Sequence, residues 1–130
     1  MHRMIVLLVA LFVGAAYAPA AAETPELDGF YAIKGVNANN EGEYSAFAQI
    51  KKTGETYSIL FQSGNVRYLG TGIMMNDILS VVYQPLVPNA SAGIASYRVH
   101  EDTITSGRWS LLGSKVVGSE IWARREKAGH

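Results

Sequence analysis

Three predicted β-strands follow one another in EYSAFAQIKKTGETYSILFQSGNVRYLGTGIMM, residues 43–75, with very short breaks between them. Apolar and polar residues alternate along each run, which is the period-two pattern of a strand with one buried face. Thr53-Gly54 and Ser63-Gly64-Asn65 separate the runs, and residues of these types favour tight turns. The stretch therefore predicts an antiparallel meander.

The same pattern continues on both sides of this stretch, without an amphipathic helix of useful length. Eight strands are predicted in all, over residues 29–36, 43–52, 55–62, 66–75, 78–84, 94–100, 103–112 and 116–125. One aromatic residue recurs in every strand at intervals of 11 to 15 residues, the length of a strand plus a short turn. These eight residues are Tyr31, Tyr44, Tyr57, Tyr68, Tyr83, Tyr97, Trp109 and Trp122.

Alternation places further small or apolar residues on the same, inner face as the aromatic residues. They are Ile33, Ala46, Ala48, Ile50, Ile59, Phe61, Gly70, Gly72, Leu79, Val81, Ala95, Val99 and Leu111. The outer face is mostly polar, with five apolar exceptions: Phe47, Leu60, Leu69, Ile73 and Ile121. Eight antiparallel strands in chain order close most simply into an up-and-down barrel, which leaves no exposed sheet edge. The predicted fold is therefore an all-β meander barrel, with a two-sheet β-sandwich as the alternative.

Five glycines fall inside predicted strands, where glycine normally weakens pairing. In a small barrel such glycines supply bends and room for large neighbouring side chains. They are Gly35, Gly70, Gly72, Gly107 and Gly118.

The N-terminal stretch MHRMIVLLVALFVGAAYAPAAAE has the features of a secretory signal peptide. Its apolar run is too short for a comfortable membrane span, which takes about 20 residues. Cleavage after Ala22 would remove residues 1–22 and leave residues 23–130 as one domain without a membrane span. We therefore expect an exported protein, periplasmic, secreted or at the cell surface. An uncleaved N-terminal anchor is the alternative.

Composition excludes several classes of function. The chain has no cysteine, so disulfides, thiol chemistry and cysteine-ligated metals are excluded. Removal of Arg3 leaves the 11 acidic residues in excess by one, which argues against a nucleic-acid partner. His100, Glu101 and Asp102 indicate a hairpin turn rather than a metal site. No Gly-x-Ser-x-Gly or phosphate-loop motif is present, so no catalytic residue, metal or cofactor is predicted.

The inner aromatic residues allow two interpretations. An eight-stranded barrel is just wide enough for side chains to fill it, or to hold one small ligand. Filling by tyrosine is reasonable if each hydroxyl finds a partner. Alternatively, small residues leave a cavity beside Tyr44, Tyr68, Trp109 and Glu120, which would bind a small hydrophobic or amphipathic molecule.

Glu120 is predicted to face inward, because it alternates with Trp122. A buried, unpaired carboxylate is costly, so we expect it to join a polar cluster with Arg124 and the tyrosine hydroxyls. The alternatives are an internal network that only fixes the register, or a hydrated carboxylate at the rim. A one-residue slip in the last strand would replace Arg124 by Arg125 on the inner face.

Several motifs resemble a family of short exported bacterial proteins, often labelled "fibronectin-binding protein" or uncharacterised. The resemblance rests on the order Gly-x-Tyr, Tyr-x-Gly-x-Gly, Gly-x-Trp and Gly-x-Glu, and it covers the chain from Gly29 to Arg124. Ala46 stands where the family usually has glycine, and Phe61 where tryptophan is common. The family label implies an extracellular-matrix protein as partner.

The chain also looks, more loosely, like the calycin barrels, such as lipocalins and avidins. In that resemblance Gly29-Phe30-Tyr31 corresponds to their first-strand Gly-x-Trp, with tyrosine in place of tryptophan. It implies that Arg124 or Arg125 covers this aromatic residue.

Three functions remain as expectations. The first is a non-enzymatic binding barrel whose candidate interior residues are the eight aromatic residues with Glu120 and Arg124. The second is an adhesin-like interaction protein with a filled core, which would use outward apolar residues or the 85–92 loop. The third is an enzyme with Glu120 as acid or base.

Overall fold

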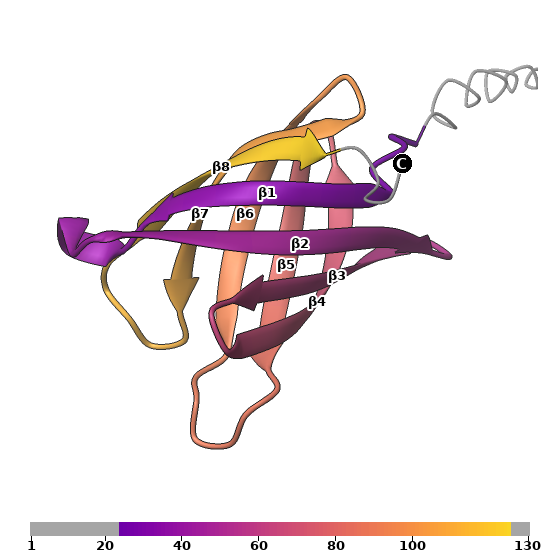
Figure 1. Cartoon of the computed structure of the whole chain (residues 1–130). Helices are drawn as coiled ribbons and strands as arrows, with labels where there is room; N and C mark the ends of the chain where they lie inside the picture. The colour runs from indigo at the N-terminus through magenta and orange to yellow at the C-terminus, as the bar shows by residue number, and fades with distance from the viewer. Residues whose placement is uncertain (1–23, 126–130) are drawn as a thin grey trace, which may run out of the picture.

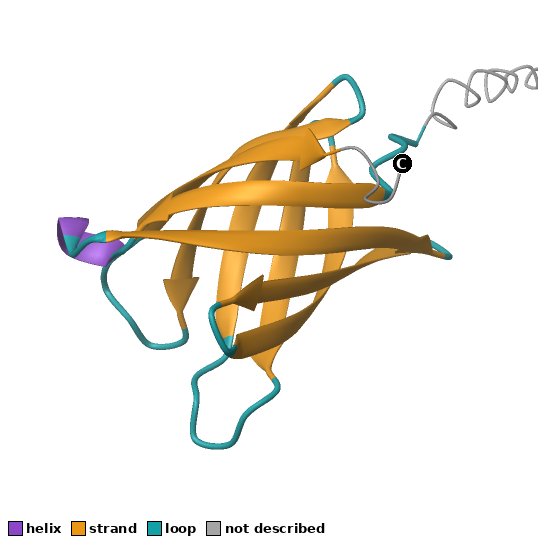
Figure 2. Cartoon of the chain, viewed as in Figure 1, coloured by secondary structure: helices purple, strands orange, loops and turns teal. Residues whose placement is uncertain are grey.

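Eight β-strands make up most of residues 24–125, the part of the chain that the computed structural model describes. They are β1 (Gly29–Val36), β2 (Glu43–Thr53), β3 (Thr56–Ser63), β4 (Val66–Met75), β5 (Ile78–Pro85), β6 (Gly93–His100), β7 (Thr103–Leu111) and β8 (Gly118–Arg125). One short 3-10 turn, η3 (Ala38–Asn40), lies between β1 and β2 (Figure 2). The predicted strand bounds hold to within two residues. The predicted signal peptide, residues 1–22, lies outside the described residues.

The strands form a closed barrel in which every neighbour in sequence is an antiparallel neighbour in space (Figure 1). Closure comes from β1 and β8, which pair from Phe30↔Arg125 to Val36↔Ser119. The predicted meander barrel is confirmed, and the sandwich alternative is wrong. No helix within residues 24–125 has the length and apolar character needed to cross a membrane.

Tight turns join the strands where the sequence predicts them. Gly54 and Gly64 have φ values of 68° and 61°, a conformation that hairpin turns need and that glycine adopts without steric cost. Asn76 and Asp102, with φ of 59° and 66°, occupy the same region in two other hairpins. Asn and Asp tolerate this conformation better than other side chains do.

Alternation buries one face of each strand as predicted, with three exceptions. A bulge shifts the register between Arg98 and Val99 and reverses the alternation at the start of β7. Ile104 is therefore fully buried, although uninterrupted alternation from Trp109 would turn it outward. Leu27, before the first strand, is also fully buried. Leu111, predicted to face inward, is 40% exposed at the end of β7.

Strand glycines make room for aromatic rings on the adjacent strand, as predicted. In four directly paired positions the ring occupies the space that a β-carbon on the glycine would take. The pairs are Gly35↔Tyr44, Gly70↔Tyr83, Gly107↔Tyr97 and Gly118↔Trp109. At Gly35, Gly107 and Gly118 an added Cβ would come within 2.4 Å of a ring atom. The aromatic residues can thus lie flat against the barrel wall.

One end of the barrel is closed by the segment that precedes β1. Leu27 is buried among the core residues, and its carbonyl accepts a hydrogen bond from the Tyr31 hydroxyl at 3.0 Å. The Tyr57 hydroxyl donates to the Pro25 carbonyl at 2.8 Å. We call residues 25–28 the N-terminal plug.

Arg124 fixes this plug to the barrel. Its guanidinium donates to the carbonyls of Glu26, Asp28 and Asp102 at 2.9, 3.1 and 2.6 Å. It also donates to the Tyr31 hydroxyl at 2.9 Å and lies 5.3 Å from the centre of the Tyr31 ring. Arg125 instead lies over Phe47 on the outer face. Arg124 is therefore the inward arginine, and it covers the first-strand aromatic residue as the calycin resemblance implies.

Arg124→Ala is expected to lower the free energy of unfolding by about 2 kcal/mol, because it removes charge-assisted hydrogen bonds to three carbonyls of the plugged end. Urea unfolding followed by circular dichroism measures the loss. Arg125→Ala is the matched control and should change stability by less than about 0.5 kcal/mol. Equal losses in the two variants would contradict the role of Arg124 in holding the plug.

Candidate functional site

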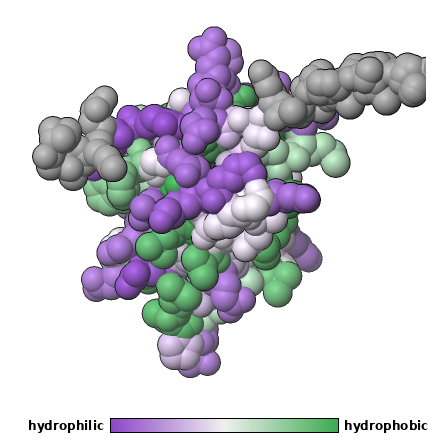
Figure 3. Space-filling model, turned by 90° about the vertical axis from the view of Figure 1, so that its right-hand side faces the viewer, coloured by the Kyte–Doolittle hydropathy of each residue, from purple (hydrophilic) through white to green (hydrophobic). Residues whose placement is uncertain are grey.

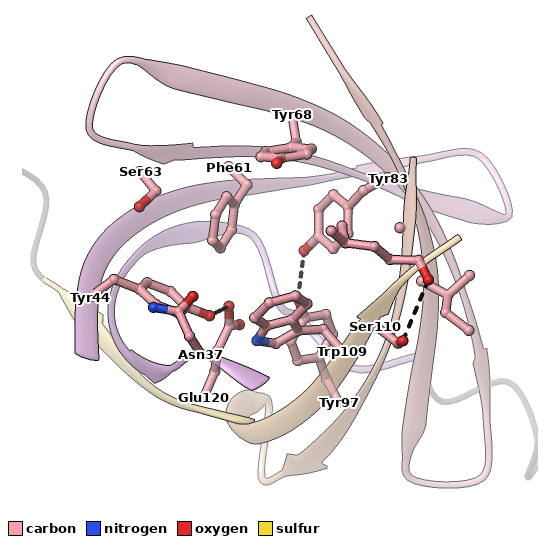
Figure 4. Close-up of a pocket in the computed structure, with 13 residues that line it drawn as sticks. Asn37, Tyr44, Phe61, Ser63, Tyr68, Tyr83, Tyr97, Trp109, Ser110 and Glu120 are labelled. Carbon is pink, nitrogen blue, oxygen red and sulfur yellow. Dashed lines mark hydrogen bonds between the residues drawn. The ribbon is translucent and has the colours of Figure 1, made fainter. Parts of the chain in front are cut away.

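A cavity of about 200 Å³ opens at the end of the barrel opposite the plug (Figure 4). Its rim comes from the connections β1–β2, β3–β4, β5–β6 and β7–β8, represented by Asn37, Ser63, Gly93 and Leu111. The walls are mainly aromatic. The wall residues are Tyr44, Phe61, Tyr68, Tyr83, Tyr97 and Trp109, together with Glu120.

The aromatic walls pack edge to face, which holds the rings apart rather than stacked. Phe61 contacts Tyr68 and Tyr83 with ring centres 5.9 and 5.7 Å apart. On the other side Tyr44 and Trp109 meet at 6.3 Å. Such contacts are favourable and directional. Tyr83 and Tyr97 lie deeper, and their hydroxyl oxygens are 2.7 Å apart.

Glu120 occupies the centre of a continuous cross-strand row at the base of this cavity. Gly35 of β1 and Gly107 of β7 are its direct neighbours, and beyond them lie Tyr44 of β2 and Tyr97 of β6. The two glycines have no side chain, so the two tyrosine rings cover the space above them, on either side of the carboxyl group. The row Tyr44–Gly35–Glu120–Gly107–Tyr97 thus places one carboxyl group between two phenol rings.

Two neutral donors hold the Glu120 carboxyl group, which is only 5% exposed. The Tyr44 hydroxyl donates to Oε2 at 2.5 Å, and the Trp122 indole N–H donates to Oε1 at 2.8 Å. Burial raises the pKa of Glu120, and the neutral donors around the carboxyl group, Tyr44 and Trp122 with the nearby Tyr97 hydroxyl, oppose that rise. Burial, with the adjacent Glu120 charge, also raises the pKa of Tyr44 well above its ordinary value.

Glu120 is expected to make stability depend on pH. Because its pKa is raised in the folded state, the folded protein retains a proton that the unfolded chain releases near pH 4.5. The free energy of unfolding should therefore decrease as pH rises from that value through the raised pKa, and then level off. Urea unfolding of wild type and Glu120→Gln across this interval isolates the effect. A stability difference between the two that does not vary with pH would contradict it.

Six of the ten residues predicted to line the interior do line the cavity: Tyr44, Tyr68, Tyr83, Tyr97, Trp109 and Glu120. Tyr31, Tyr57, Trp122 and Arg124 do not. Trp122 lies in the middle of the core, with ring centres 5.4 Å from Tyr31 and 4.7 Å from Tyr97. Tyr31, Tyr57 and Arg124 contact the N-terminal plug.

The predicted cluster of Glu120 with Arg124 is wrong, although the predicted pairing of Glu120 with a tyrosine hydroxyl is confirmed. Four residues along a strand span about 13 Å, so the two side chains reach opposite halves of the barrel. Trp122 lies between them on the same face. Among residues 24–125 no ion pair joins Glu120 to a basic side chain.

The residues that sequence reasoning missed lie mostly at strand ends. Asn37, Ser63, Gly93, Ile94 and Ser110 contribute to the cavity from the rim. Their positions depend on how the connections fold over the opening, and strand alternation carries no signal for that. Phe61 and Leu111 were assigned to the inner face, but not to the candidate site.

Trp109 carries an unused hydrogen-bond donor. Its indole nitrogen Nε1 is buried and has no hydrogen-bond partner in the described part of the chain. An indole N–H can only donate, and a buried donor without an acceptor is costly. The cavity therefore contains one carboxyl group on otherwise largely aromatic walls, whereas the Trp109 N–H is buried against Gly118 of the barrel wall.

Within residues 24–125 no three histidine or carboxylate side chains come together as metal ligands would. His100, Glu101 and Asp102 form the β6–β7 hairpin turn, in which His100 and Glu101 are largely exposed. No family model matches the chain, and no curated protein has a significantly similar sequence. The function must therefore be argued from the cavity itself.

Proposed function

We propose that this protein is an exported, non-enzymatic barrel that binds one small, mostly apolar molecule in the cavity opposite the plug. The observation that carries the proposal is an aromatic cavity with one buried carboxyl group, that of Glu120, at one end of the barrel. Binding pockets typically combine apolar walls with a few polar groups that fix orientation.

The cavity volume sets the size of that molecule. Pockets for drug-sized ligands measure roughly 300–1,000 Å³, whereas an apolar protein cavity of about 150 Å³ accepts benzene. At about 200 Å³ this cavity fits one ring with a small substituent, or a short chain. The proposed ligand is therefore much smaller than the retinoids or fatty acids that fill wider barrels.

Native mass spectrometry of the protein purified from its own cells tests the proposal, with a denaturing measurement of the same sample. A mass excess that disappears on denaturation is expected. Phe61→Trp should reduce the excess, because the larger ring extends into the cavity from β3. Leu69→Trp, on the outer face of β4, is the matched control and should retain it. The proposal would be overturned if the native mass of the wild type equals that of the protein alone and small aromatic probes do not bind.

A second candidate is a surface or matrix-interaction protein, and the outer face of the barrel favours it. Apolar side chains reach the surface between polar ones (Figure 3). Ile73, Val82 and Ile94 are 54%, 54% and 59% exposed, and Val82 pairs directly with Ile94. Contiguous apolar surface of this kind marks protein contacts. If the protein shows no bound ligand in native mass spectrometry and binds immobilised fibronectin, and Val82→Glu abolishes that binding, this candidate is favoured.

A further inference from the structure

Within residues 24–125 no counter-charge pairs with the Glu120 carboxyl group. Its two described hydrogen bonds come from a phenol and an indole, both neutral. The other described residues that line the cavity include no lysine, arginine or histidine. A carboxylate has about four acceptor positions, so two remain for another donor. The site is built to hold a carboxylate, yet it lacks the cation that normally accompanies a buried one.

The walls around this carboxyl group are suited to a cation. Rings from β2, β3, β4, β5 and β7 surround one space in Figure 4, and the phenol of Tyr97 borders it from β6. An aromatic ring carries partial negative charge on its face and attracts a cation within about 6 Å of its centre. Cages of several aromatic side chains around a quaternary or methylated ammonium are the best-known use of this attraction.

We propose that the cavity selects a small organic cation, an ammonium group on a single ring or short chain, with Glu120 as its counter-charge and the aromatic walls as its cage. This rests on the proposed binding function and specifies the ligand class for it. The ammonium group lies near Oε1 and Oε2 of Glu120, and the apolar part of the molecule contacts Phe61 and Tyr68 towards the mouth. A neutral ligand that meets a protonated Glu120 is the rival occupant.

A matched pair of probes separates charge from shape. Phenyltrimethylammonium and tert-butylbenzene have the same outline, but only the first is charged, and its charge does not change with pH. Titration followed by tryptophan fluorescence and by ligand-observed NMR measures both affinities. The cation is expected to bind wild type at least about 10-fold more tightly than its neutral counterpart.

Two further measurements identify Glu120 as the source of that preference. Glu120→Gln should weaken the cation at least about 10-fold and leave tert-butylbenzene within about 3-fold of wild type. Gln retains an acceptor for Trp122 and a donor for Tyr44, so the row can persist. Glu43→Gln removes one charge from the exposed surface at the same end of the barrel and should change neither affinity.

The pH dependence of the affinity for the cation can be measured on the wild-type protein alone. The titratable groups that face Glu120 are the hydroxyls of Tyr44 on β2, Tyr83 on β5 and Tyr97 on β6, and burial raises the pKa of each beyond the working range. Lys34 and Glu43 border a groove on the outer side of β1 and β2, which Glu120 also reaches. The affinity of the cation should increase as pH rises through the pKa of Glu120 and then level off. The affinity of tert-butylbenzene should not increase.

The outcomes separate the two proposals. Tighter binding of the cation, lost in Glu120→Gln, supports the ligand class. Equal or tighter binding of tert-butylbenzene to wild type overturns the ligand class but leaves the binding function intact. Failure of both probes, with a bare native mass, overturns both proposals.

Discussion

Gly107→Ala is expected to lower the free energy of unfolding by about 3 kcal/mol, a large fraction of the stability of a small domain. A β-carbon at position 107 would lie 2.2 Å from Cδ1 of Tyr97 and 3.1 Å from the Ser96 carbonyl oxygen. The Tyr97 ring cannot move away, because the residue is 1% exposed and its hydroxyl is bonded to Tyr83. Urea unfolding measures the loss.

Gly72→Ala provides the control for this variant. Gly72 is also a buried strand glycine, but the atoms nearest to its β-carbon would be aliphatic side-chain atoms of Leu79 and Val81, at 3.0 Å or more. Gly72→Ala should lower the free energy of unfolding by about 1 kcal/mol. In a double-mutant cycle, the cost of Gly107→Ala should fall by at least about 1 kcal/mol when Tyr97 is already alanine. An unchanged cost would show that the ring is not the obstacle.

Trp122→Ala is expected to cost about 4 kcal/mol. The indole is 3% exposed and packs between Tyr31 and Tyr97, so its removal leaves a large void between the plugged half and the cavity. It also removes one of the two donors to Glu120, whose carboxyl group then remains buried with less support. Chemical denaturation with near-ultraviolet circular dichroism detects both the loss of stability and the loss of fixed aromatic packing.

Trp109→Ala is the natural comparison, because Trp109 is the other tryptophan of the chain. It lies at the cavity, is only partly buried, and makes no hydrogen bond through Nε1. Its replacement should lower the free energy of unfolding by about 1–2 kcal/mol, at most half of the loss at Trp122. If the two variants lose equal stability, the cavity end is packed as tightly as the core, which would contradict the looser packing inferred for Trp109.

The barrel fold could be predicted because the sequence pattern that indicates it is local along the chain. Alternation assigns each side chain to a face within a few residues, and the aromatic spacing gives the strand repeat without any long-range information. The same reasoning placed Glu120 inside and gave the four residues first proposed to line a cavity: Tyr44, Tyr68, Trp109 and Glu120.

The rest depends on contacts between distant residues. The bulge that buries Ile104 arises where β6 and β7 pair, and neither strand encodes it alone. Leu27 belongs to no periodic segment, so nothing marked it as a plug. Which tyrosine hydroxyl reaches Glu120 follows from the register of β8 with β1 and of β1 with β2, whereas the sequence indicated only Arg124 and unspecified tyrosines as partners.

The pairing of β1 with β8 has a consequence for how the protein is made. During synthesis the ribosome delivers β1 long before β8, and the contacts of Arg124 with the plug span up to 98 residues of sequence. The early strands can form hairpins one after another, but the two open edges persist until β8 is complete. The cavity and its carboxylate row therefore cannot be complete before β8 has joined β1 and β7. A chain stalled before β8 is complete would expose both sheet edges to other chains. Chaperones would bind the protein in this open state.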